Sequence, residues 1–234
     1  MLAGVVAGGL ALIFARIFGE PAVSSAIALE SARAQAAGLI PGPELVSRRV
    51  QSTLGLATAV IVYGVTIGGF FGLVYALAQG RIGPLSARAT AAVVALVGFG
   101  SVVLVPFLKY PANPPSVGHP DTIGHRSGLY FTLLATSALL AVAAVYLCRH
   151  LVPRLGAWDA CIVAVLAYTA AVAVAAALLP GVHEVPPDFP ADLLWRFRVA
   201  SLGTQAVLWA GLGLLFGALT ERAALSRSGS GRGV

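Results

Sequence analysis

The chain has 234 residues, of which 58% are hydrophobic and only 10% are charged. Because a soluble globular domain carries roughly 25% charged residues, this composition excludes an ordinary soluble protein and indicates an integral membrane protein. The net charge of +6 comes almost entirely from arginine, since Lys109 is the only lysine. The arginines stand singly or in pairs at the ends of apolar runs, which suits lipid headgroups rather than nucleic acid.

Six apolar segments are near or above the length of about 20 residues that a helix needs to cross a bilayer. They are Leu2–Phe18, Gln51–Ala78, Ala89–Leu108, Ser127–Leu147, Trp158–Leu179 and Val199–Thr220. The first has no basic residue ahead of it, so we expect a retained helix rather than a secretory signal. The fold class that follows is all-α, a polytopic membrane helix bundle of about six transmembrane helices.

Two further segments flank these spans. Glu20 and Pro21 suit the first turn of an additional helix that reaches about Ala37. Its loosely apolar side predicts a helix that lies along the membrane surface. Residues 1–222 then form the transmembrane domain, whereas 223–234 are rich in Ser, Gly and Arg, which predicts a disordered tail.

Proline-bearing loops recur at equal intervals along the chain. A PGP ends at Pro43, an NPP at Pro115 and a VPP at Pro187, and each loop leads to arginine before the next apolar segment. The simplest explanation is three tandem helical hairpins, each with a proline loop between an odd and an even helix. All three loops would then lie on one side of the membrane.

The placement of arginines favours one orientation. Basic residues are equally numerous on the two sides, but the short turns at 80–88 and 149–157 hold theirs close to helix ends. Positive charge near helix ends favours the cytoplasm. We therefore expect a multi-pass protein of the cell (plasma) membrane, with both termini in the cytoplasm and the proline loops outside.

The second proline loop, Lys109–Arg126, carries His119, Asp121 and His125 within seven residues. The third adds His183 and Glu184 on the same predicted face. Imidazole nitrogens and carboxylates suit cobalt, nickel or zinc, and an acidic mouth concentrates cations. These five residues are the candidate metal ligands. The competing interpretation is that the acidic residues pair with nearby arginines, namely Arg126, Arg196 and Arg198.

A second group of candidate ligands surrounds the turn between the fourth and fifth predicted spans. It consists of Cys148, His150, Asp159 and Cys161. Thiolates with an imidazole and a carboxylate can form an inner metal site. The alternative is that the cysteines are small apolar packing residues, as free cysteines often are.

Glycines recur at four-residue spacing in the second and sixth spans. They are Gly64, Gly68 and Gly72, and Gly213 and Gly217. Glycines with this spacing share one helix face and allow another helix to approach closely. They predict helix packing; the alternative is that they line a path where substrate meets the backbone.

The loop after the third span gives the chain a family resemblance. The matching residues are Lys109, Tyr110, Pro111, Asn113, Pro114, Pro115, Pro120, Thr122, Ile123, Gly124 and Arg126, in the pattern KYP.NPP followed by P.TIG.R. The chain resembles the CbtA family of predicted cobalt transporter subunits. This resemblance implies cobalt import together with a small partner subunit that has one spanning helix and a histidine-bearing tail. It implies cobalt as the transported ion and no tightly bound cofactor.

The sequence has no G-x-S-x-G, HExxH or P-loop motif. We therefore expect a protein that is not an enzyme and has no catalytic residues. Polar side chains in the spans are sparse, which favours a subunit that needs a partner to complete an ion path. The rival hypothesis is a metal-free membrane scaffold whose loops bind another protein.

Overall fold

The computed structural model describes residues 1–38, 46–115 and 117–230, and helices are the regular structure of these residues. The helices are α1 (Leu2–Phe14), α2 (Glu20–Ala36), α3 (Arg48–Val50), α4 (Leu56–Ala78), α5 (Ala87–Gly98), α6 (Val105–Lys109), α7 (Ile123–Leu178) and α8 (Ala191–Ser230). Three π-helical turns, η1 (Ala15–Gly19), η2 (Gln51–Gly55) and η3 (Phe99–Leu104), join some of them, and η4 (Pro120–Thr122) is a short 3₁₀ turn before α7. The predicted all-α fold class is confirmed.

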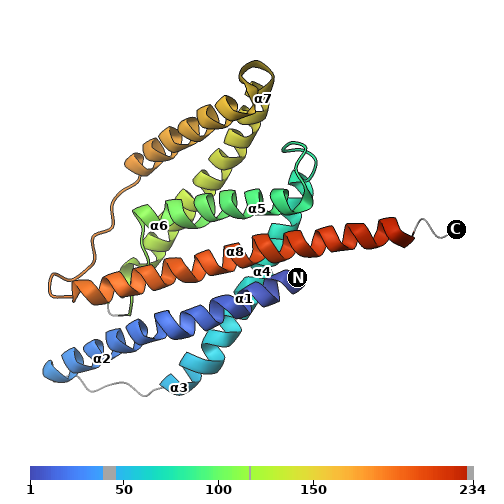
Figure 1. Ribbon diagram of the computed structural model, residues 1–234. Coiled ribbons are helices and arrows are strands. Elements are labelled where there is room, and N and C mark those ends of the chain that lie inside the picture. Colours follow the sequence, from blue (N-terminus) through green and yellow to red (C-terminus); the bar gives the residue numbers. More distant parts are fainter. Residues whose placement is uncertain (39–45, 116, 231–234) are drawn as a thin grey trace.

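Within the described residues, five helical stretches are long and apolar enough to cross a membrane. The longest, Pro120–Leu178, is folded in two at Gly156, whose φ of 79° and ψ of 165° interrupt α7. Glycine tolerates this positive φ because it has no Cβ. The two arms of α7 lie side by side (Figure 1), and the hydroxyls of Ser137 and Tyr168 are 2.7 Å apart across them. The fourth and fifth predicted spans are these two arms.

The first predicted span and the predicted surface helix are one continuous stretch, Leu2–Ala36. The prediction of a separate helix along the membrane surface is therefore wrong. Proline at position 21 lacks an amide donor, which would normally weaken a helix interior. Here the π-helical turn η1 comes just before it and the Glu20 N–H bonds to the Ala15 carbonyl, so the hydrogen bonds rearrange around the proline and the helix continues.

Glycines bring α1 against α4. A Cβ built on Gly4 would lie 2.6 Å from the main-chain oxygen of Gly64, and one on Gly68 would lie 2.8 Å from the Cα of Gly4. These distances allow no side chain, so the predicted packing role of Gly64 and Gly68 is confirmed. Gly72 differs, because its nearest neighbour is the Phe216 ring at an ordinary 3.5 Å.

The α8 helix packs along α1 and α5 (Figure 1). A Cβ on Gly213 would lie 2.7 Å from the Cβ of Ala95, and one on Gly217 would lie 3.0 Å from the Cα of Arg88. The core of this bundle includes Phe71, Trp209 and Leu212. The first predicted hairpin packs helix against helix, with α1 on α4. The third does not, because α8 packs on α1 and α5 instead of on the second arm of α7.

The α7 hairpin stands apart from this bundle, which it contacts through α6 and η3 (Figure 1). In its most apolar window only 6% of residues are buried, against 33% in Leu2–Ala36. Its apolar surface therefore faces outward.

The proline loops that the structure describes lie at one end of the molecule, to the left in Figure 1. A second small apolar core forms there from Ala22, Ala26, Val117, Phe189 and Leu193. It joins α2, the loop before η4 and the beginning of α8. Pro43 belongs to residues 39–45, which lie outside the described part of the chain.

Part of the segment predicted to be a disordered tail is helical. The α8 helix continues to Ser230, beyond the predicted boundary at Arg222. Ala223, Ala224 and Leu225 are strong helix formers that follow directly on an existing helix, and propagating a helix is far easier than starting one. Residues 231–234 lie outside the described part.

Candidate functional site at the proline-loop end

The Glu184 carboxylate joins the second and third proline loops. Its Oε2 accepts hydrogen bonds from the His119 N–H at 3.0 Å and from the Thr122 hydroxyl at 2.9 Å. Arg126 Nε lies 3.3 Å from the same oxygen, and Arg126 also donates to the His119 carbonyl at 3.2 Å. Both charged side chains are largely covered, with 15% of the Glu184 side chain and 23% of the Arg126 side chain exposed. One carboxylate therefore fixes the distance between the two loops.

These contacts stabilise the ionised form of Glu184. The pKa of its carboxyl is held below the usual range, first by the hydrogen bond from Thr122 and then by that from the His119 N–H and the charge of Arg126. Partial burial opposes this shift without cancelling it. Glu184 is therefore charged at neutral pH, and its Oε2 is the oxygen that all three groups contact.

The structure brings some of the predicted metal ligands together and leaves others apart. Glu184 touches His119, but through the main chain of His119 rather than through its imidazole. Asp121, His125 and His183 are exposed at the same end. Among residues 1–38, 46–115 and 117–230, no three His, Cys, Asp or Glu side chains are grouped closely enough to hold a metal ion. The predicted ligand set is therefore present on one face but is not gathered into a preformed site.

Part of the competing interpretation is seen directly. Glu184 pairs with Arg126, as that interpretation expected. Asp188 pairs at 2.7 Å with Arg33 of α2, an arginine that the interpretation did not name. Arg198 takes a different partner from the one considered from sequence, because it donates to the side chain of Asn113 at 2.9 Å. The latter contact holds the KYPANPP segment against α8.

Tyr110 adds a further tie between the same loops. Its hydroxyl donates to the Pro180 carbonyl at 2.8 Å, which joins the end of α6 to the segment after α7. Burial of this side chain raises the pKa of the Tyr110 phenol, so it stays a neutral donor. The Tyr and Asn of the loop motif therefore serve to dock the loop.

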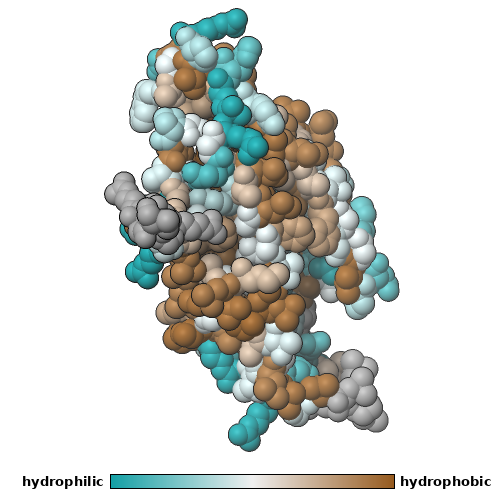
Figure 2. All heavy atoms as spheres, turned by 90° about the vertical axis from the view of Figure 1, so that its right-hand side faces the viewer, coloured by the Kyte–Doolittle hydropathy of each residue, from teal (hydrophilic) through white to brown (hydrophobic). Residues whose placement is uncertain are grey.

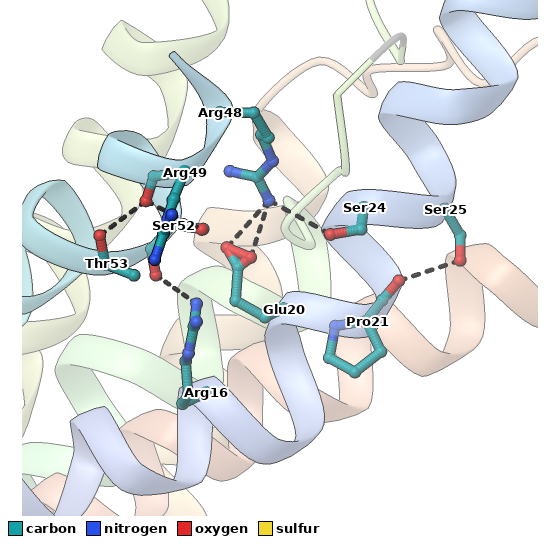
Figure 3. Close-up of polar contacts among 9 residues, drawn as sticks. All are labelled: Arg16, Glu20, Pro21, Ser24, Ser25, Arg48, Arg49, Ser52 and Thr53. Atoms are coloured by element: carbon teal, nitrogen blue, oxygen red, sulfur yellow. Dashed lines mark hydrogen bonds and ion pairs between the residues drawn. The ribbon is translucent and has the colours of Figure 1, made fainter. Parts of the chain in front are cut away.

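Sequence reasoning missed a charged cluster where the first helical stretch meets the start of the second (Figure 3). Arg16, in η1, donates to the main-chain oxygen of Ser52 in η2. One turn further, Glu20 accepts bonds of 2.9 and 2.7 Å from Arg48. The signal was present, because Arg16 and Glu20 stand four residues apart at the end of an apolar run, and that spacing places them on one helix face.

At the opposite end, the structure brings together only part of the second predicted group. The sulfurs of Cys148 and Cys161 are 3.1 Å apart on the two arms of α7, and both cysteines are free thiols. His150 and Asp159 do not complete a metal site with them among the described residues. The group is a thiol pair rather than a four-ligand site.

Comparison with known proteins identifies the family to which the chain belongs. Neither the curated proteins nor the solved structures gave a match. The family model described as "Probable cobalt transporter subunit (CbtA)" matches residues 1–221. The match includes every helical stretch described above up to the last turns of α8. The chain therefore belongs to the CbtA family of probable cobalt transporter subunits.

Proposed function

We propose that this chain is the integral membrane subunit of a system that takes up cobalt or a similar divalent transition metal. The observation that carries the proposal is the family match over residues 1–221, on a chain with five long apolar helical stretches. The protein is located in the plasma membrane, with the proline-loop end outside the cell and both termini in the cytoplasm.

The proline-loop end is the proposed capture surface. Histidines from two loops, His119, His125 and His183, lie at this end with Asp121, and all four are exposed. Nitrogen and carboxylate ligands suit cobalt, and exposed side chains can meet a hydrated ion. Because these ligands are not gathered in the structure, the loops move when the ion arrives, with Glu184 joining only after it leaves Arg126.

Passage through the membrane requires a partner. Several polar groups of the spans are already engaged within the protein: Thr66 bonds to the Val62 carbonyl and Thr169 to the Val165 carbonyl, each at 2.9 Å. Hydroxyls of this kind are too few to replace the hydration shell of a divalent ion, whose transfer into hydrocarbon is costly. A small single-span subunit with a histidine-bearing tail supplies the remaining ligands.

The capture surface is tested by replacing His119, Asp121, His125 and His183 together with alanine and measuring radiolabelled cobalt accumulation in cells. The matched control is His150→Ala, which removes the remaining histidine from the other end of the molecule. We expect uptake to fall at least tenfold in the fourfold variant and to stay unchanged in the control. Unchanged uptake, with normal amounts of the variant in the membrane, would overturn the capture surface and favour a metal-free scaffold.

The need for a partner is tested by reconstitution into liposomes. The chain alone is expected to insert stably and to move little cobalt, whereas addition of the single-span subunit restores flux. Saturable cobalt flux from the chain alone would show that its own helices contain the whole pathway.

A further inference from the structure

The close approach of the two thiols of α7 is not explained by metal transport. Cys148 lies on the first arm and Cys161 on the second, and their sulfurs are 3.1 Å apart. Divalent transition metals in such sites need three or four protein ligands, and no third His, Cys, Asp or Glu joins the pair among the described residues. Two thiols held this close can instead be joined as a disulfide when an oxidant accepts their two electrons.

Helix geometry keeps the two sulfurs aligned. Cys148 is about three turns from Ser137, and Cys161 is about two turns from Tyr168, so both pairs use the same faces of the two arms. The Ser137 and Tyr168 hydroxyls are 2.7 Å apart. Gly156, with its positive φ, connects the arms between the cysteines. One independent contact, between Ser137 and Tyr168, and one reversal, at Gly156, therefore fix the register that brings the thiols together.

The pair is also accessible to water-soluble reagents. Cys161 is exposed and Cys148 is partly exposed. Charged residues between them in the chain, including Arg149, Arg154 and Asp159, are exposed as well. Figure 2 shows hydrophilic side chains around the top of the molecule, where Figure 1 places the reversal of α7. Charged groups of this kind lie at the membrane surface and not in hydrocarbon.

We propose that Cys148 and Cys161 form a reversible intrachain disulfide by exchange with a low-molecular-weight disulfide such as oxidised glutathione. The Cys161 thiolate attacks one sulfur of the reagent, which forms a mixed disulfide and releases one glutathione. The Cys148 thiolate then attacks the Cys161 sulfur and releases the second glutathione. The two cysteines lose two electrons, the reagent gains them, and the two thiol protons end on the two released glutathione molecules.

The disulfide would lock the free end of the α7 hairpin. The hairpin contacts the bundle at its other end, through α6 and η3, and the chain reverses at Gly156 between its arms. A covalent bond near this point removes the freedom of the arms to separate. The redox state of the pair would thus set how firmly the hairpin is closed.

The test uses the full-length protein in detergent, treated with oxidised glutathione and measured by intact mass. The wild type is expected to lose the mass of two hydrogens, without an adduct, and to recover it with dithiothreitol. Cys148→Ser and Cys161→Ser are each expected to keep one glutathione adduct, because the resolving thiol is missing.

The positional control is the double variant Cys161→Ser, Ile162→Cys, which turns the second thiol about a quarter of a turn around its helix. It is expected to retain adducts rather than to form the internal disulfide. The proposal is overturned if folded wild type keeps two free thiols while the unfolded protein reacts, if it carries two adducts, or if its disulfide links two chains on a non-reducing gel.

Discussion

Replacing Gly64 by alanine is expected to weaken the contact between α1 and α4. The added Cβ would lie 2.9 Å from both the main-chain oxygen of Gly4 and the Cα of Gly8. These neighbours are backbone atoms that cannot rotate away, so the helices must move apart. Overpacking costs about 1–3 kcal/mol, and the better helix propensity of alanine returns at most about 1 kcal/mol. When this gain is subtracted, a net loss of up to about 2 kcal/mol follows.

The measurement is thermal unfolding of the purified protein in one detergent. For a chain of this size, the expected loss lowers the melting temperature by up to roughly 8 °C. Gly69→Ala is the matched control, because a Cβ on this neighbouring residue of α4 would meet nothing within 4 Å. If Gly64→Ala melts no lower than Gly69→Ala, the close approach of the two helices is refuted.

Three other predictions concern the proline-loop end. The pKa of Glu184 is lowered in the folded state, so the ionised carboxylate contributes its full stability above the unfolded pKa of about 4.3 and loses it as the pH falls through the folded pKa. The difference in melting temperature between wild type and Glu184→Gln should therefore vanish in acid. A difference that stays constant down to about pH 3 would contradict this prediction. Arg48→Met leaves the partly buried Glu20 without its partner and is expected to destabilise the protein by about 1–3 kcal/mol, whereas the exposed Arg49→Met should not. With Cys148 and Cys161 replaced by serine, single cysteines at Ser47, Asp121 and Val185 should all react with an impermeant reagent added outside intact cells, while one at Pro84 should not; labelling of only some of the first three would be incompatible with a common outer face.

The amino-acid sequence determined the membrane class and the helix inventory. Apolar runs of about 20 residues leave few choices, because a backbone in hydrocarbon must satisfy its own hydrogen bonds and helices do so locally. The sequence also indicated the family, because the motif from Lys109 to Arg126 is short and specific. The spacing of Gly64 and Gly68 predicted a tight helix contact, which the structure confirms.

The tertiary structure decided which helix fills each contact. Nothing in the spacing of Gly64 says that its neighbours are Gly4 and Gly8, because any helix with small residues fits such a face. The same holds for α8, whose Gly213 meets Ala95 of α5 although the nearest helix in sequence is the second arm of α7. Helix pairing depends on the summed packing of whole faces, which local sequence does not contain.

The candidate site, like the fold, was predicted in part from the sequence and decided in part only by the tertiary structure. Sequence placed histidines and acids on two loops and predicted that those loops share one end, because each follows an odd number of spans. Only the structure showed that Glu184 is engaged by Thr122, the His119 N–H and Arg126, and that Cys148 and Cys161 meet while His150 and Asp159 stay apart from them. Hydrogen bonds and thiol contacts form within a few ångströms, and distances on that scale are set by the packing of complete helices rather than by position in the chain.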